Sequence, residues 1–75
     1  MADLKLDTLG KKCPMPVLLA KKEMTKMAAG DVLTVTADDA GALKDIPALV
    51  NKSPGFAISE SKQEGNIITI KIKKA

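Results

Sequence analysis

The order of the hydrophobic periodicities constrains the fold of this 75-residue chain more than any other feature of its sequence. Residues 4–7 (LKLD) alternate apolar and polar side chains, which predicts a short strand with both leucines facing the core. From Pro14 the apolar residues recur at spacings of three and four, which predicts a helix. Proline suits the first helical turn, where amide groups lack partners within the helix, and we expect Gly30 to end the helix as its C-terminal cap.

The second half of the chain repeats this change of period. Residues 32–37 (VLTVTA) are rich in β-branched side chains, which predicts a central strand. Asp38 and Asp39 end this strand, and either carboxylate is expected to cap the helical turn that follows. Because Pro47 interrupts the next apolar pattern, we predict a short first turn and then a second helix restarted at Asp45.

Two further strands are predicted at residues 56–61 and 67–72, around a hairpin turn at 63–66. The element order is therefore βαβαββ. Right-handed connections place both helices on the same side of the sheet. We predict a single α+β domain over residues 1–75, a two-layer sandwich in which a four-stranded mixed sheet carries two helices on one face.

The composition indicates how such a small domain is held together and where it works. With one cysteine and no histidine, neither an intramolecular disulfide nor a conventional metal cluster is available as a staple, so the 45% of apolar residues must supply the core. No apolar run approaches the roughly 20 residues of a membrane helix, so no membrane interaction is expected. A lone thiol fits a reducing compartment, and we expect a small soluble protein of the cytoplasm.

The charge pattern gives weak support to a role in nucleic-acid binding. The net charge is +3, a mild positive field that can steer an acidic partner. Every basic residue is lysine, so no arginine offers bidentate contacts to bases or phosphates, and a single aromatic residue cannot form a stacking surface. We expect no direct nucleic-acid partner.

Cys13 is the residue on which any covalent chemistry depends. It follows Lys11 and Lys12 and precedes Pro14 and Pro16, at the predicted start of the first helix. Free cysteine ionises near pH ~8.5, and a helix N-terminus with cationic neighbours favours the thiolate. The prolines remove amide donors but fix the backbone around the sulfur.

The missing residue types narrow what this thiol can do. Acyl transfer needs a Cys–His pair, dithiol redox cycling needs a second cysteine, and zinc binding needs several ligands. A thiol that accepts a group and passes it on remains, and a persulfide is the natural cargo. The alternative is a buried cysteine that acts only as a small hydrophobic residue, which the lysines and prolines around it argue against.

Residues 6–16 (LDTLGKKCPMP) resemble the signature of the TusA/SirA-like sulfur-carrier family. That signature has an Asp at the strand end, a Gly three residues later and Cys-Pro-x-Pro opening the first helix. The resemblance continues at residues 30–31 (GD), 37–39 (ADD) and 44–47 (KDIP), in order and over essentially the whole chain. The family's βαβαββ sandwich is also the fold predicted from the periodicities.

The resemblance implies a carrier-type sulfurtransferase that acts with partner proteins rather than as a stand-alone catalyst. Cys13 carries the persulfide, received from a donor such as a cysteine desulfurase or a rhodanese and delivered to an acceptor such as a DsrE-type protein. No cofactor beyond this covalent persulfide, and no metal, is expected, and we expect a monomer. The alternative function is a regulatory or RNA- or protein-interaction module in which the thiol is incidental.

Other residues are predicted to have supporting roles. Lys11, Lys12, Pro14 and Pro16 shape the surroundings of the thiol. Asp7 is expected to cap the loop or to hydrogen-bond near Cys13, unless it is a solvated turn residue, and Gly10 to supply a turn of positive φ. The resemblance implies a partner-facing patch that contains Asp38, Lys44 and Asp45; the alternative is that the two aspartates cap helices and the lysine is solvated.

Overall fold

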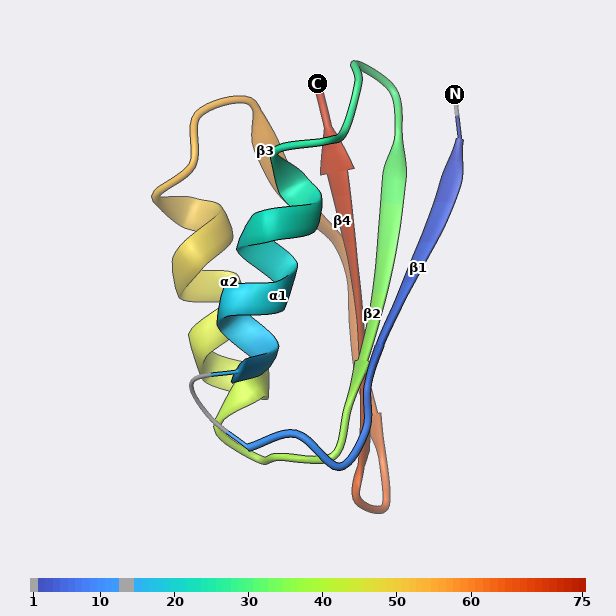
Figure 1. The fold of residues 1–75 in the computed structure, drawn as a ribbon, viewed down its shortest axis with the longest axis vertical. Helices are drawn as coiled ribbons and strands as arrows, with labels where there is room; N and C mark the ends of the chain where they lie inside the picture. Colours follow the sequence, from blue (N-terminus) through green and yellow to red (C-terminus); the bar gives the residue numbers. More distant parts are fainter. Residues whose placement is uncertain (1, 13–14) are drawn as a thin grey trace.

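The computed structural model of the chain describes residues 2–12 and 15–75, which form four strands and two helices (Figure 1). Their order is βαβαββ, as predicted. The elements in chain order are β1 (Asp3–Thr8), α1 (Met15–Met24), β2 (Val32–Ala37), α2 (Ala42–Asn51), β3 (Phe56–Glu64) and β4 (Ile67–Lys74).

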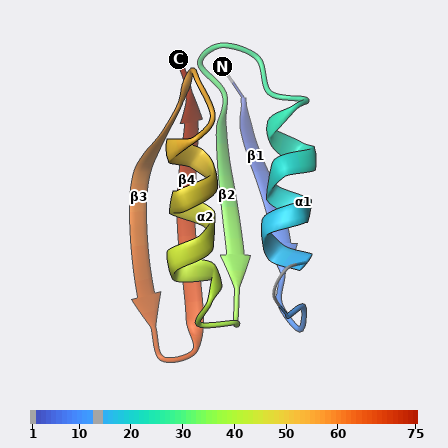
Figure 2. The same ribbon diagram turned by 90° about the vertical axis from the view of Figure 1, so that its left-hand side faces the viewer.

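The four strands form one mixed sheet in the order β1-β2-β4-β3. β1 runs parallel to β2, whereas β2 and β3 both run antiparallel to β4. The register places Thr8, Ala37 and Ile68 in one row, at the end of β1 and β2 and the beginning of β4. Both helices begin at this same end of the sheet, since each follows a strand that ends there (Figures 1 and 2).

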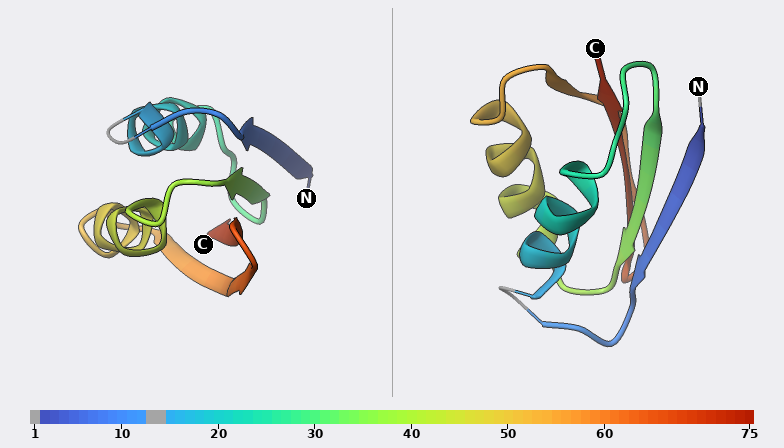
Figure 3. Two further views of the ribbon diagram at one scale, coloured as in Figure 1. Left: turned by 90° about the horizontal axis from the view of Figure 1, so that it is seen from below. Right: turned by 45° about the horizontal axis from the view of Figure 1, so that its top comes forward.

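Both helices cover the same face of the sheet, and the core lies between the two layers (Figure 3). Alternate residues of β2 and β4 are buried, as expected for strands with one covered face. Burying each large aliphatic side chain contributes about 1.5–3 kcal/mol. The leucines of β1 are half-buried against this core, whose most buried members are Ala20, Leu33, Ile46, Val50, Ile70 and Ile72.

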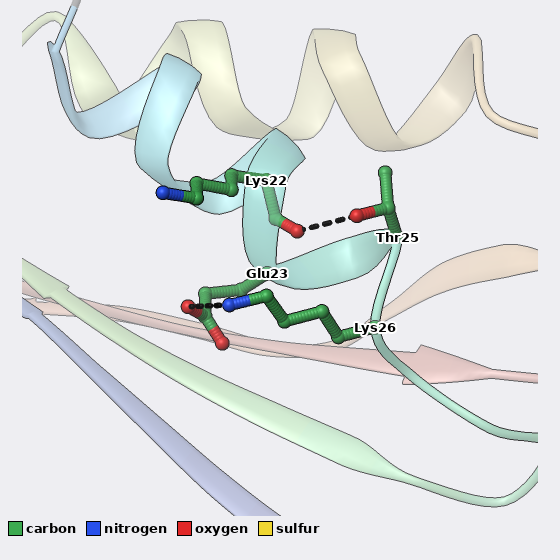
Figure 4. A network of polar contacts seen from close by, with 4 residues as sticks. All are labelled: Lys22, Glu23, Thr25 and Lys26. Carbon is green, nitrogen blue, oxygen red and sulfur yellow. Dashed lines mark hydrogen bonds and ion pairs between the residues drawn. The ribbon is translucent and has the colours of Figure 1, made fainter.

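The predicted extent of the first helix is wrong at its C-terminal end, because α1 ends at Met24 and does not reach Gly30. The Thr25 hydroxyl donates a 2.6 Å hydrogen bond to the carbonyl of Lys22, the group to which the Lys26 amide would bond in a continuing helix (Figure 4). The Lys26 amide instead bonds to Glu23, three residues back, at 3.0 Å. The helix therefore tightens and stops.

Gly30 lies in the turn that leads into β2, where its φ is 90°. Asp31 closes this turn, since its carboxylate accepts hydrogen bonds from the amides of Ala28 (2.9 Å) and Ala2 (3.0 Å). The ammonium group of Lys74 donates to the carbonyl of Met27 at 3.0 Å. These contacts tie the start of β1, the end of α1 and the end of β4 together, at the end of the molecule opposite to the helix starts (Figure 1).

The prediction that the second helix restarts at Asp45 is also wrong, because α2 is one continuous helix with Pro47 inside it. Proline removes one backbone hydrogen bond, the one that would reach the Leu43 carbonyl, but the buried side chains of α2 keep the helix in place. The N-cap residue is Gly41, whose amide donates a 3.0 Å hydrogen bond to Asp39 Oδ1, so Asp39 is the aspartate of the pair 38–39 that caps this turn. The side chain of Asp38 accepts a hydrogen bond from the Gly10 amide instead.

The β3–β4 hairpin has a tighter turn than predicted. Only Gly65 and Asn66 separate the strands, and the φ of Gly65 is 61°. A positive φ at the first of two central residues is typical of a type II′ turn, whose twist matches that of the paired strands. The hairpin was predicted in the correct place, but the two strands remain paired up to Glu64 and Ile67, so the turn is two residues shorter than the predicted one at 63–66.

Candidate functional site

The site predicted from the sequence surrounds Cys13, which lies with Pro14 outside the described residues. The residues on either side of this pair are described. The amide of Met15 donates a 2.9 Å hydrogen bond to the carbonyl of Lys12, so the two flanks are fixed relative to each other. Pro16, in the first turn of α1, is buried, whereas Lys11 and Lys12 are exposed.

The loop that leads to Cys13 is organised by hydrogen bonds to its backbone. The Leu9 amide donates to Asp7 Oδ1 at 2.9 Å, and the Lys11 amide donates to the carbonyl of Thr8 at 3.0 Å. The predicted positive φ of Gly10 is confirmed, at 80°. A Cβ atom at this position would meet nothing within 4 Å, so glycine is required here for its conformation and not for space.

Asp38 connects this loop to the loop that follows β2. Its Oδ2 accepts a 3.0 Å hydrogen bond from the amide of Gly10, across 28 positions of sequence. Behind this contact, the hydroxyl of the fully buried Thr8 donates to the carbonyl of Thr36 at 2.6 Å, so the strand ends that carry both loops are bonded to each other. The loop at residues 9–12 is thereby held against the ends of β1 and β2.

A cavity of about 400 Å³ lies between these two loops. Its lining brings together an ammonium group and two carboxylates, one of which, Asp39 Oδ1, accepts a 3.0 Å hydrogen bond from the Gly41 amide. An open cavity of this size beside the residues that precede Cys13 can admit a side chain or a short segment of a partner. It is lined by Gly10, Lys12, Asp38, Asp39 and Ala40.

The structure brings some of the predicted site residues together and leaves others apart. Gly10, Lys12 and Asp38 meet at the cavity, whereas Lys44 and Asp45 belong to the first turns of α2 and are not among its lining residues. The residues that the sequence reasoning missed are Asp39 and Ala40. The dipeptide at 38–39 was visible as a strand end, but its contact with a loop 28 residues earlier has no local signature.

Large apolar side chains are exposed at this end of the molecule. Among residues 2–12 and 15–75, five such side chains are exposed, and all lie where β1 ends or where α1, α2 and β4 begin (Figures 1 and 2). Met15 and Leu18 lie close together on α1, and adjoining exposed apolar side chains of this kind mark surfaces that bind partners. Ile67 is not part of such a surface, because the burial of Ile68 turns its side chain to the other face of the sheet. The five residues are Leu9, Met15, Leu18, Leu43 and Ile67.

Other potential binding features are limited within the described residues. Residues 2–12 and 15–75 contain no group of three or more His, Cys, Asp or Glu side chains arranged to hold a metal ion. Neither of the two helices in this part of the chain has the length and apolar content needed to cross a membrane.

Comparison with known proteins assigns this arrangement to a family. The family model described as "Sulfurtransferase TusA" matches residues 4–74. The sulfur carrier protein TusA of Allochromatium vinosum is 44% identical over 73 residues, which cover 97% of this chain and 95% of that protein. The Bacillus subtilis protein YrkI, whose name proposes a sulfur-carrier function, is 40% identical over 73 residues that cover 97% of this chain and 96% of YrkI.

A solved structure shows the same architecture. The crystal structure of a SirA-like protein from Desulfitobacterium hafniense superposes with a TM-score of 0.78 at 28% sequence identity, covering 96% of this chain and 95% of that one. The α+β fold and the family resemblance inferred from the sequence are thereby confirmed. The chain belongs to the TusA sulfurtransferase family.

Proposed function

We propose that this protein is a sulfur carrier that holds sulfane sulfur as a persulfide on Cys13 and relays it from one protein to another. The observation that carries the proposal is the near full-length similarity, at 44% identity, to a protein named as a sulfur carrier. Within the chain, Cys13 is the only thiol, and the sequence contains no histidine to support acyl transfer.

The proposed loading step is a thiol–persulfide exchange that needs no oxidant or reductant. The Cys13 thiolate attacks the outer sulfur of a donor persulfide and forms a new S–S bond. The S–S bond of the donor breaks, and its electron pair leaves with the donor cysteine as a thiolate, while the proton stays on the transferred sulfur. Delivery to an acceptor thiolate is the same exchange in the opposite direction.

The described residues support this exchange by holding the loop at residues 9–12, which precedes Cys13 in the sequence, with an open cavity beside it. Asp38 fixes the backbone of Gly10 through a hydrogen bond, and the cavity adjoins the same loop. Lys11 and Lys12 expose their side chains on this loop. The lysines favour a thiolate in the protein and on an approaching donor. We expect the protein to act as a monomer in the cytoplasm, without a metal, a resident cofactor or a nucleic-acid partner.

Intact-mass measurement tests the proposal. The protein is incubated with a cysteine desulfurase and cysteine, and separately with a rhodanese and thiosulfate. We expect a gain of one sulfur atom that a reductant removes and that the Cys13→Ser variant does not show. Absence of this gain with both donors would overturn the proposal and leave an interaction module with an incidental thiol.

The acceptor side is tested with the loaded protein. After removal of the donor, the persulfidated protein is mixed with a DsrE-type protein, and both masses are followed. Loss of one sulfur atom from this chain and its gain by the other protein supports relay. A persulfide that only decays to solution, with no gain by the second protein, contradicts that choice of acceptor.

A further inference from the structure

The side of α1 that faces away from the core has exposed apolar residues in its first turn. Met15 and Leu18 are 42% and 51% exposed and stand three positions apart, so they are neighbours on the helix surface. The opposite side of the helix is turned to the core through Pro16, Ala20 and Met24, which are buried. Nothing in the described part of the chain packs over the first pair enough to bury it.

A positively charged surface adjoins these apolar residues. Lys21 and Lys22 follow along α1, and Lys11 and Lys12 precede it. None of these four lysines takes part in an ion pair between described residues. The only acidic side chain on α1, Glu23, is paired with Lys26 at 3.7 Å, as Figure 4 shows.

We propose that this surface, formed by Met15, Leu18 and the lysines at 11, 12, 21 and 22, is where the sulfur donor protein docks. The proposal rests on the sulfur-carrier function proposed above. The chemistry of the surface specifies the donor: an apolar socket for Met15 and Leu18, bordered by carboxylates that face the lysines. Charge complementarity of this kind guides encounter, and the apolar contact supplies retention.

A protein fits this surface better than a nucleic acid does. The phosphate backbone would pair with the lysines but would leave two exposed apolar side chains at the centre of the contact. The surface has no arginine and no aromatic ring on which bases could stack. A donor docked here also contacts Lys12 and Met15, the described residues on either side of the pair 13–14 in the sequence.

The apolar part of the proposal is tested with a matched pair of variants. Leu18→Ser removes an aliphatic side chain from the proposed surface. Ile67→Ser removes one of similar exposure, 41%, from β4, where the burial of Ile68 turns the Ile67 side chain to the other face of the sheet. We expect sulfur loading of Leu18→Ser by a cysteine desulfurase at limiting protein concentration to slow about tenfold. The control variant is expected to load at the wild-type rate.

The charged part is tested by reversing two charges in two places. We expect Lys21→Glu/Lys22→Glu to slow loading by the protein donor about tenfold at low ionic strength, with the difference shrinking as salt is added. Lys5→Glu/Lys73→Glu makes the same change in net charge on exposed residues of β1 and β4. This control is expected to retain most of the wild-type rate.

Loading by glutathione persulfide separates docking from chemistry and from folding. This small donor needs no docking surface, so the Leu18 and Lys21/Lys22 variants should react with it at the wild-type rate. Equal slowing with both donors, or equal slowing by the control variants, would overturn the docking surface without touching the carrier function. Failure of the wild-type protein to load with any donor would instead remove the proposed function. Salt-sensitive binding of an RNA hairpin that depends on Lys21 and Lys22, with protein loading unchanged, would also overturn the proposal.

Discussion

Asp38 Oδ2 accepts a 3.0 Å hydrogen bond from the amide of Gly10 and so joins the loop after β2 to the loop that leads to Cys13. It links the two loops across 28 positions of sequence. The geometry gives Asp38 a positioning role, whereas the partner-facing role that the sequence resemblance implies stays a prediction.

Replacing Asp38 with alanine is expected to slow sulfur loading from a protein donor by about threefold to tenfold. The exposed hydrogen bond contributes only about 0.5–1.5 kcal/mol to folding, so the protein should remain folded. Asp38→Asn keeps an oxygen acceptor for the Gly10 amide and should load at close to the wild-type rate. If sulfur loading of the asparagine variant is slowed as much as that of the alanine variant, the charge of Asp38 matters and the hydrogen bond does not. An alanine variant that loads at the wild-type rate would contradict the positioning role.

Gly10→Ala is expected to destabilise the protein by about 1–2 kcal/mol, because the φ of 80° is unfavourable for a residue with a Cβ atom. No steric clash contributes, since the space around the position is open. Gly10→Asn should cost less, because asparagine tolerates positive φ. Urea unfolding of the three proteins measures the difference, and an alanine variant as stable as the wild type would contradict this interpretation of the loop.

The pH dependence of stability should reveal Asp31. The hydrogen bond from the Ala28 amide lowers the pKa of Asp31, partial burial opposes this shift, and the Ala2 amide and the Lys74 charge lower the pKa further. The pKa of Asp31 is therefore lower in the folded protein than in the unfolded chain, where it is about 3.9. The ionised carboxylate stabilises the folded protein at neutral pH, and this contribution is lost as the pH falls below about 3.9 towards the folded-state pKa. The wild type should therefore lose stability between about pH 5 and 3, and Asp31→Asn should lose less over the same interval. Asp3→Asn, which changes an exposed residue of β1, is the control, and equal pH dependence of Asp31→Asn and the wild type would contradict the prediction.

Pro47→Ala is expected to stabilise the protein by about 1–2 kcal/mol, since it restores an amide that can bond to the Leu43 carbonyl within α2. The gain is smaller than the full cost of a helical proline because alanine also increases the freedom of the unfolded chain. Thermal or urea unfolding checks the stability, and Ala48→Gly, one position later on the exposed side of the helix, should change it in the opposite direction. A destabilised Pro47→Ala variant would show that the helix has adapted its packing to the proline.

Periodicity was sufficient to predict the fold, because alternating and helical patterns report which face of each element is buried. It could not predict where α1 ends, since Met27 is buried at helical spacing although it lies beyond the helix. The end is set by the Thr25 hydroxyl and by the Asp31 turn, which compete with the helix for the same backbone groups. The prediction that the helix is interrupted at Pro47 was wrong for the opposite reason, because the buried side chains of α2 stabilise the helix more than one missing backbone hydrogen bond destabilises it.

Only those features of the candidate site that depend on neighbouring residues in the sequence could be predicted. Residues 7–16 indicated a constrained loop before a helix, and the φ of Gly10 followed from the glycine. The cavity and the Asp38–Gly10 contact depend on two loops that meet only because β1 and β2 are parallel and end in register. Pairing of this kind carries no signal in either loop alone.

Because β1 and β2 are parallel, contacts that stabilise the fold lie at one end of the molecule and the loops of the candidate site lie at the other. Asp31 and Lys74 lock one end, where the chain termini and the α1–β2 turn meet, while the loops at 9–12 and 38–41 occupy the other. Substitutions of the exposed side chains of these two short loops, other than those at Gly10 and Asp38, can therefore change the surface that partners meet without disturbing the residues that keep the domain folded. A scaffold built in this way can acquire new partners during evolution at little risk to its stability.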